Sequence, residues 1–326
     1  RWTMPRTILP VLLLFLLSVP ALASHATQDS PPPADPAGEP VAAPDTRTFP
    51  NIPSPNGLAI APLTQRLYVT SRNSNQVLML DAQTGAVLKQ AAVGVLPWGV
   101  AVNPSNNRLY VANFTSGDLY VLDATTLARI TIASLGSGAE PAFIGVHPDS
   151  GRVLVAGHGR NQLWVLTPDG VIEHSIPTGG NGAWGLAVHP YLKRAYVGHR
   201  DSANVITFDG NNNWQPIAGQ SITPCGVTGH PFALNFNPVN DRLYVACAPD
   251  QNVSQVKVYR ASSGGLTLVA SLAAGSGGPD GGGGIAINTA TNNVFFTNST
   301  SRSVTVIGSN PDRVVATVQA GADPFG

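Results

Sequence analysis

The chain has 326 residues, of which 43% are hydrophobic, and its 34 Gly and 28 Pro indicate many turns and short elements instead of long helices. Eighteen basic residues balance 18 acidic ones, and this net charge of zero excludes a general attraction to nucleic acid or to an anionic membrane. Glu39, Glu140 and Glu173 are the only glutamates, which leaves few carboxylates for acid–base catalysis.

Residues 1–23 have the features of a signal peptide. Arg6 precedes an apolar run from Ile8 to Val19, and the following Ala-Leu-Ala supplies the small residues that a signal peptidase recognises. The apolar run is too short to span a bilayer comfortably, and no second apolar segment of about 20 residues follows it. We therefore predict cleavage before Ser24 and an exported mature chain, periplasmic, at the cell surface or secreted, with no membrane span.

Residues 24–53 are predicted to be a linker. Proline is too frequent between Asp29 and Pro55 for a helix or a central strand, because proline lacks the backbone N–H that both structures use. Such a segment is extended, with polyproline character in places. The folded domain is therefore expected to begin near residue 54.

A repeated unit occupies the rest of the chain. The stretch RLYVANFTSGDLYVLDATT (residues 108–126) repeats the pattern of RLYVTSRNSNQVLMLDAQT (residues 66–84). The residue that closes the first strand of each unit falls at positions 62, 104, 148, 190, 238 and 289, which gives spacings of 42, 44, 42, 48 and 51 residues. Periods of about 40 to 45 residues with several short strands per unit are typical of β-propeller blades.

Each unit is predicted to form a four-stranded blade. In the second unit the strands are residues 99–104, 108–113, 118–123 and 129–135, from the innermost to the outer edge. The middle strands are apolar on successive residues, as expected of a sheet covered on both faces. We therefore expect an all-β propeller with six blades, near residues 55–95, 97–137, 141–179, 183–220, 231–275 and 282–321. The final ADPFG (residues 322–326) resembles the LPWG that opens the second unit, so we also expect the start of a seventh blade and a truncated C-terminus.

The units RLYVTS, RLYVAN, RAYVGH and RLYVAC, with GVAVNP before them and VLDATT after them, resemble the YVTN family of β-propeller repeats, which occurs in exported and surface proteins of bacteria and archaea. The resemblance covers residues 54–326 and implies seven blades in a complete protein. It implies no particular activity, since this scaffold hosts binding proteins and enzymes alike. Phe143 departs from the pattern where other units have Gly, and Ser71 and Cys247 depart from it at the name-giving Asn.

The loops that enter each inner strand share one face of a propeller with the loops between second and third strands, and binding residues concentrate on such loops. Trp98, Trp184 and Phe232 are expected at entry turns on this face, either as a stacking platform for a sugar or peptide or as a plug of the central channel. The charged candidates for ligand binding on the same face are Arg72, Arg160, Arg200 and Asp201.

Histidines give the main indication of an enzyme. His158, His199 and His230 are expected on the loop-rich face of three successive units, with Glu140 at the entry to the first of them. Imidazoles and a carboxylate that converge at a channel mouth can hold a divalent metal. These four residues are therefore the predicted ligands of a metal site, if one exists.

Four other residues are predicted to have structural roles. His147 and His189 stand directly before the proline that closes the first strand, so we expect them to act in that turn. Cys225 and Cys247 are 22 positions apart in a chain that is expected to be exported, which favours a disulfide.

The sequence contains no G-x-S-x-G, H-E-x-x-H or C-x-x-C motif, and we assign no catalytic residue. We predict a monomeric, non-enzymatic propeller without a cofactor, which binds an envelope protein, a glycan or a small ligand at the cell envelope or outside the cell. The alternative is a metal-assisted lactonase or lyase with its site at the channel mouth. A structural surface-layer or adhesion module is a third reading.

Overall fold

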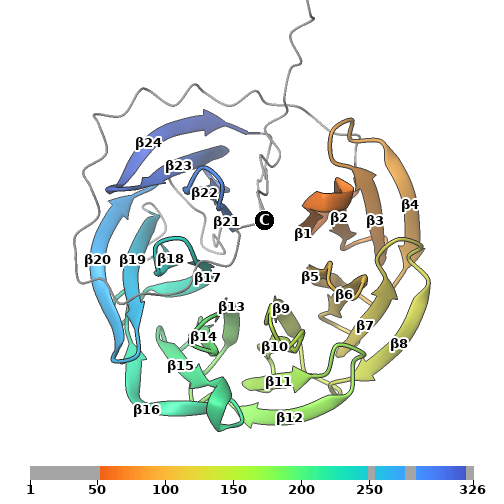
Figure 1. Cartoon of the computed structure of the whole chain (residues 1–326), viewed down its shortest axis with the longest axis horizontal. Coiled ribbons are helices and arrows are strands. Elements are labelled where there is room, and N and C mark those ends of the chain that lie inside the picture. Colours follow the sequence, from red (N-terminus) through yellow and green to blue (C-terminus); the bar gives the residue numbers. More distant parts are fainter. Residues whose placement is uncertain (1–51, 249–253, 276–283, 321–326) are drawn as a thin grey trace, which may run out of the picture.

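The computed structural model describes residues 52–248, 254–275 and 284–320, which form 24 strands in six antiparallel sheets of four strands each. The sheets stand as blades around a central axis (Figure 1), which confirms the predicted all-β propeller with six blades. None of the helices in the described ranges has the length and apolar character that a membrane span requires. The predicted signal peptide, almost all of the linker and the start of a seventh blade lie outside these residues.

Within each blade the strands follow one another outward from the axis. The first three blades contain β1 (Pro55–Ala61), β2 (Arg66–Ser71), β3 (Gln76–Asp81) and β4 (Val87–Ala92); β5 (Pro97–Asn103), β6 (Arg108–Asn113), β7 (Asp118–Asp123) and β8 (Arg129–Ser134); and β9 (Pro141–Val146), β10 (Val153–Gly157), β11 (Gln162–Leu166) and β12 (Ile172–Pro177). The last three contain β13 (Ala183–His189), β14 (Arg194–His199), β15 (Val205–Asp209) and β16 (Gln215–Ile222); β17 (His230–Asn237), β18 (Arg242–Ala248), β19 (Gln255–Ser262) and β20 (Gly265–Ala273); and β21 (Ile285–Asn288), β22 (Asn293–Asn298), β23 (Ser303–Ser309) and β24 (Asp312–Gln319). Two short 3-10 helices, η1 (Pro62–Thr64) and η2 (Gly210–Asn212), lie in turns of the first and fourth blades.

The core lies between neighbouring blades. Tyr110 and Leu119 of the second blade form one buried cluster with Val153 and Trp164 of the third. Corresponding clusters join the other consecutive pairs from the first blade to the sixth. Both faces of a middle strand are therefore covered, which explains why β6 and β10 are buried on successive residues instead of alternate ones.

In several blades the Arg or the Tyr of the RLYV pattern fastens one blade to the next. The hydroxyl of Tyr68 donates to the Ala124 carbonyl at 2.6 Å, and that of Tyr110 donates to the Pro168 carbonyl at 2.8 Å, in each case in the following blade. Arg194 of the fourth blade donates to backbone carbonyls of the fifth. The repeated motif is therefore a link between blades as well as a strand.

The link changes at the end of the described ring. Arg242 and Tyr244 of the fifth blade both meet Asp312 of the sixth, and the tyrosine hydroxyl donates to Oδ1 at 2.8 Å. The sixth blade has Asn293 and Phe295 at the Arg and Tyr positions, so it has neither group. Its described strands make no contact with the first blade comparable with the packing of consecutive blades, and the two stand well apart in Figure 1.

In five of the six blades, the turn that closes the first strand is held by the side chain just before it; the first blade has Ala61 there and lacks this bond. His147 and His189 do this with Nδ1, which accepts the backbone N–H of Ser150 and Leu192 respectively. This is the turn role that was predicted for the two histidines. In three other blades an asparagine Oδ1 accepts the backbone N–H two residues further on: Asn103, Asn237 and Asn288.

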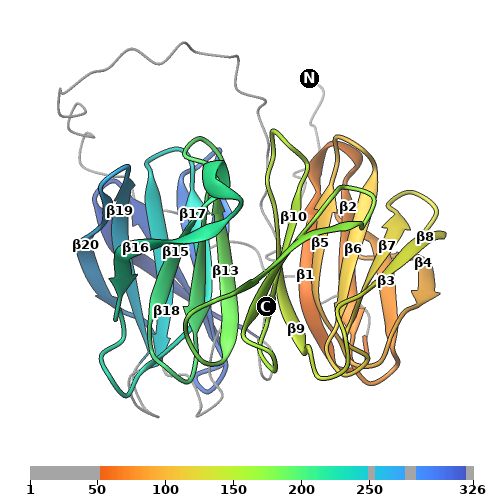
Figure 2. The same cartoon turned by 90° about the horizontal axis from the view of Figure 1, so that it is seen from below.

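The two faces of the ring, seen edge-on in Figure 2, carry different loops. The mouth face is the face that carries two sets of loops: those between second and third strands, and those that enter the next inner strand. Backbone hydrogen bonds join the two sets, such as the one from the Val93 N–H to the Asn75 carbonyl at 2.9 Å. The turn face is the opposite face. It carries the turns between first and second strands and the turns between third and fourth strands. A disulfide joins Cys225 to Cys247, as predicted, and ties the loop before β17 to β18 on the mouth face.

Candidate functional site

Four aromatic rings from three blades form one cluster on the mouth face. Trp98 and Phe114 belong to the second blade, Trp184 to the fourth and Phe232 to the fifth. The ring centroids of Trp98 and Trp184 are 5.2 Å apart with the planes at 81°, and Phe114 lies 5.5 Å from Trp98. Trp184 and Phe232 are only 7% and 3% exposed, whereas Trp98 and Phe114 are partly exposed. The cluster is thus closely packed on one side and accessible to a ligand on the other.

The rings meet because the inner strands approach one another closely. A Cβ atom on Gly99 would lie 2.3 Å from the carbonyl oxygen of Ala142 on the neighbouring inner strand, so a side chain does not fit there. The third blade has Phe143 at the equivalent position, and its partly buried ring packs against the aromatic cluster. This departure from the repeat therefore adds apolar surface beside the site.

Two arginines lie over the rings. The guanidinium carbon of Arg72, in the first blade, is 4.6 Å from the Trp98 ring centroid. That of Arg200, in the fourth blade, is 5.9 Å from the Trp184 centroid and 5.7 Å from the Phe232 centroid. Such cation–π contacts hold the guanidinium groups in place. Because a guanidinium matches carboxylate and phosphate oxygens, the cluster combines stacking surface with groups that attract an acceptor.

An imidazole stands between two carboxylates beside this cluster. Nδ1 of His158 is 2.8 Å from Oε2 of Glu140, and its Nε2 is 3.6 Å from Oδ2 of Asp201. The His158 ring also meets Trp184 edge-on, with centroids 5.3 Å apart and planes at 88°. The carboxylate side chains are 37% and 53% exposed, so both are open to solvent. Glu140 orients the imidazole, and this arrangement is chemically able to accept or donate a proton.

Three other predicted residues do not join the pairing of His158 with the two carboxylates, although the His230 ring meets Phe232 with centroids 5.7 Å apart. Nε of Arg160 donates to the Ser137 carbonyl at 3.0 Å, which holds the arginine on the neighbouring loop. Nδ1 of His230 is 2.6 Å from the carbonyl oxygen of Arg200, so it is engaged with backbone. His199 is fully buried at the end of β14, and burial lowers its pKa to about 4.

The predicted metal site requires His158, His199, His230 and Glu140 to converge. Of these, His158 and Glu140 contact each other, while the other two occupy the separate places just described. In the three described ranges no group of three or more His, Cys, Asp or Glu residues is arranged to hold a metal ion. The donor set in this conformation fits a carboxylate–imidazole pair and does not fit a metal centre, so no chemical step is derived through a metal.

Phe114 is the member of the cluster that the sequence analysis did not single out. It is the first loop residue after the second strand of its blade, and Arg72, His158 and Arg200 hold the same position in theirs. Phe114, Arg72, His158 and Arg200 therefore share one position of the repeat, which can be read from the sequence alone. The contact between His158 and Asp201 has no such signal, because it depends on how the third and fourth blades are placed in space.

No family model and no curated protein sequence matches this chain. Solved structures with a similar fold include hydrazine synthase from Kuenenia stuttgartiensis, with a TM-score of 0.69 and 20% sequence identity over 86% of this chain and 90% of that chain. A protein of unknown function from Desulfotomaculum acetoxidans gives a TM-score of 0.69 and 16% identity over 86% of this chain and 89% of that chain. At these identities the likeness shows the β-propeller fold alone.

Proposed function

We propose that this protein is an exported β-propeller of the YVTN type that binds a ligand or partner on its mouth face and does not catalyse a reaction. The observation that carries the proposal is the convergence of Trp98 and Trp184 with Arg72 and Arg200 on one face, from three different blades. Its place of action is the cell envelope or the outside of the cell. The predicted signal peptide supports export, and the disulfide is compatible with it, since structural disulfides persist in oxidising compartments.

The chemistry of the site favours a polar ligand with a flat apolar face. Trp98 and Phe114 offer partly exposed rings, Arg72 offers a cation above one of them, and Glu140 and Asp201 offer carboxylates beside them. Sugars and aromatic peptide side chains stack on such rings while their polar groups bond to charged neighbours. A glycan that carries acidic groups, or a peptide of an envelope protein, therefore suits this surface best.

Binding can be tested on the mature chain with an array of neutral and uronic-acid-containing oligosaccharides and with a pull-down from envelope extract. For any ligand found, Trp98→Ala should weaken binding by about fivefold, because loss of one stacking ring is worth about 1 kcal/mol. Tyr191→Ala is the matched control, since this tyrosine is 58% exposed on the turn face. If the wild-type protein, Trp98→Ala and Tyr191→Ala bound the ligand with equal affinity, the mouth face would not be its binding surface.

A second candidate is enzymatic, and the pair of Glu140 and His158 at 2.8 Å favours it. An oriented imidazole beside a second carboxylate is a common acid–base arrangement. Hydrazine synthase, an enzyme by its name, has a similar fold, which supports only the view that such a scaffold can accommodate catalysis. The test is a lactone and lyase substrate screen with and without added divalent metal, in which His158→Gln must abolish any activity found.

A further inference from the structure

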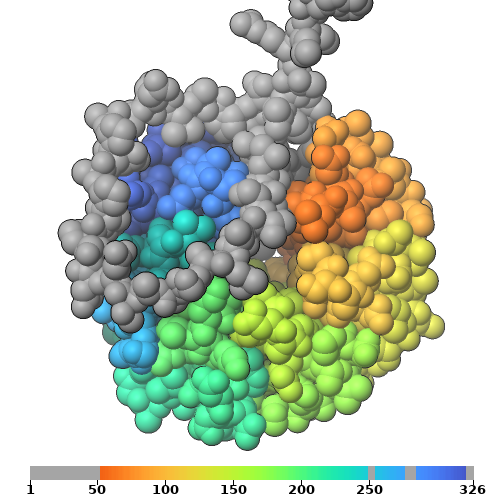
Figure 3. Space-filling view, in the orientation of Figure 1, coloured from red at the N-terminus to blue at the C-terminus, as the bar shows by residue number. Residues whose placement is uncertain are grey.

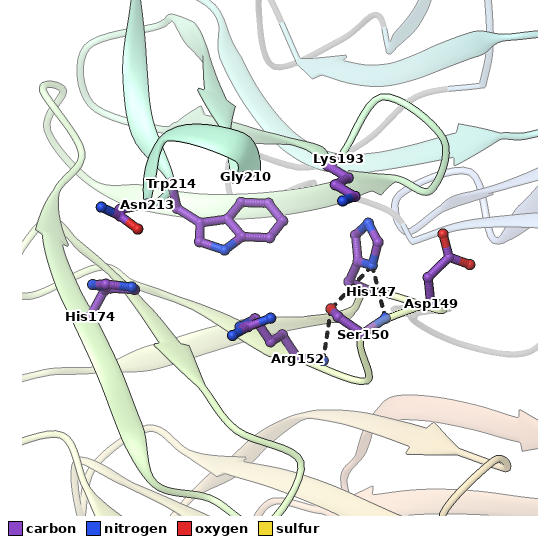
Figure 4. A pocket seen from close by; sticks show the side chains of 9 residues that line it. All are labelled: His147, Asp149, Ser150, Arg152, His174, Lys193, Gly210, Asn213 and Trp214. Atoms are coloured by element: carbon purple, nitrogen blue, oxygen red, sulfur yellow. Dashed lines mark hydrogen bonds between the residues drawn. The ribbon is translucent and has the colours of Figure 1, made fainter.

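A polar pocket of about 340 Å³ lies on the turn face, between the third and fourth blades and away from the mouth-face cluster. Four separate segments line it, with the side chains shown in Figure 4: the turn between β9 and β10, β12, the turn before β14 and the segment before β16. Its ionisable and aromatic lining residues are His147, Asp149, Arg152, His174, Lys193 and Trp214. Nothing in the proposed function uses this pocket.

His147 supplies a buried hydrogen-bond donor to the pocket. Its Nδ1 accepts the backbone N–H of Ser150 at 3.4 Å and also lies 3.2 Å from the serine hydroxyl, so in the neutral ring the proton sits on Nε2. The residue is only 1% exposed, and Nε2 has no partner with hydrogen-bond geometry, although the Pro190 carbonyl is near. A buried donor that lacks a partner destabilises the fold unless an acceptor reaches it.

Lys193 supplies a second donor beside the first. Both residues line the pocket, and in Figure 4 the lysine side chain points toward the Nε2 edge of the His147 ring. The other two lysines of the chain both have acceptors, since Lys89 donates to the Thr125 carbonyl at 3.2 Å and Lys257 to the Ser271 hydroxyl at 2.7 Å. Within the described part of the chain Lys193 has no such acceptor for its ammonium group.

The remaining charges do not satisfy these donors. Arg152 forms a two-pronged ion pair with Glu173, at 2.6 and 3.1 Å, which uses the charge of both partners. Asp149 is an exposed carboxylate in the turn next to His147, and it makes no ion pair with Lys193 within 4 Å in the described residues. Trp214, buried and edge-on to His147 with centroids 6.1 Å apart, forms the apolar wall.

We propose that this pocket binds a small organic anion, whose carboxylate or phosphate oxygens accept from Nε2 of His147 and from the Lys193 ammonium group while its body lies against Trp214. Two adjacent donors without an acceptor are complementary to an oxyanion. The volume is that of a metabolite-sized site. The ligand is therefore a small carboxylate or a phosphorylated small molecule, distinct from the glycan or peptide expected at the mouth face.

The test is isothermal titration of the mature protein with inorganic phosphate, with succinate and with uncharged glucose, in a buffer without competing anions. Lys193→Gln should weaken anion binding at least tenfold, because it deletes a charge-assisted hydrogen bond. Lys257→Gln removes the same charge from a lysine with its own acceptor and should leave the affinity unchanged. The tighter of phosphate and succinate assigns the anionic group.

A second variant separates the donor from the fold. His147→Asn replaces the histidine by the residue that closes the same turn in three other blades, so the turn acceptor is kept while the Nε2 donor is lost. It should melt near the wild-type temperature and bind the anion at least tenfold more weakly. Absence of saturable binding of either anion, an equal effect of both lysine substitutions, or binding of glucose in preference to both anions would overturn the proposal.

Discussion

At equivalent positions of the repeat, the turn face keeps one bond from blade to blade while the mouth face changes its chemistry. On the turn face five blades place an acceptor, Asn or His, before the residue that closes the first strand, and each accepts a backbone N–H of the turn. On the mouth face the first loop residues of the first four blades are Arg72, Phe114, His158 and Arg200. A position that repeats one bond maintains the fold, whereas dissimilar side chains that meet in one place indicate a ligand site.

Acidification gives the largest expected effect, and it acts on both faces. Burial lowers the pKa of His189, on the turn face, and of His199, on the mouth face, to about 4. Below pH 6.5 the unfolded chain gains protons that the folded chain does not bind, so stability present above pH 6.5 is lost as the pH falls toward 4. The free energy of unfolding should decrease by about 2 kcal/mol for each histidine by pH 5.

Denaturant unfolding at pH 7.5 and pH 5 measures this loss. The variants His189→Asn and His199→Asn place at each site the residue that other blades use there, Asn103 and Asn113 in the second blade. Each should reduce the loss by about 2 kcal/mol, while the contribution of His147, whose pKa burial also lowers, remains. An unchanged difference between the two pH values in the double variant would mean that other groups cause the loss.

Reduction of the disulfide should have the next largest effect. The bond between Cys225 and Cys247 closes a loop of 22 residues, and such a link typically contributes about 3 kcal/mol to the free energy of unfolding. The disulfide holds a loop of the mouth face in place. The Asn and His side chains that cap turns on the turn face have no counterpart in this loop. Thermal unfolding with and without a reducing agent measures the effect, and the double variant Cys225→Ser, Cys247→Ser should be insensitive to the agent.

Removal of one turn cap should have a smaller effect. Oδ1 of Asn103 accepts the backbone N–H of Ser105 at 3.1 Å, so Asn103→Ala should decrease the free energy of unfolding by about 1 kcal/mol. Asn103→Asp keeps an acceptor and should cost much less. Equal losses in the two variants, measured by chemical denaturation, would show that the bond to the turn is not what matters at this position.

Arg72→Gln should have the smallest effect on stability and a clear effect on binding. The arginine lies over Trp98 on the mouth face, and loss of a partly exposed cation–π contact is worth about 0.5 kcal/mol. Affinity for a mouth-face ligand should fall while the melting temperature stays within a few degrees. A large loss of stability without loss of binding would show that Arg72 has a structural role, like the capping residues of the turn face.

The repeat, the six blades and the strands of each blade could be predicted because they depend on local patterns. The turn role of His147 and the pairing of Cys225 with Cys247 were also accessible, since each rests on a position or a spacing in the chain. The burial of His199 was not, because it depends on how blades cover one another. The turn-face pocket could not be predicted for a similar reason, since four segments between residues 147 and 214 come together only in the folded chain.

The bonds that join the blades also bear on how such a ring can grow. Tyr68, Tyr110 and Arg194 carry the donor in one blade, and the acceptor in the next is a backbone carbonyl. A carbonyl is present whatever side chain stands there, so a gene segment that encodes one blade can be duplicated or moved without a matching change in its new neighbour. The Arg and Tyr of the RLYV motif are therefore compatible with multiplication of the repeat.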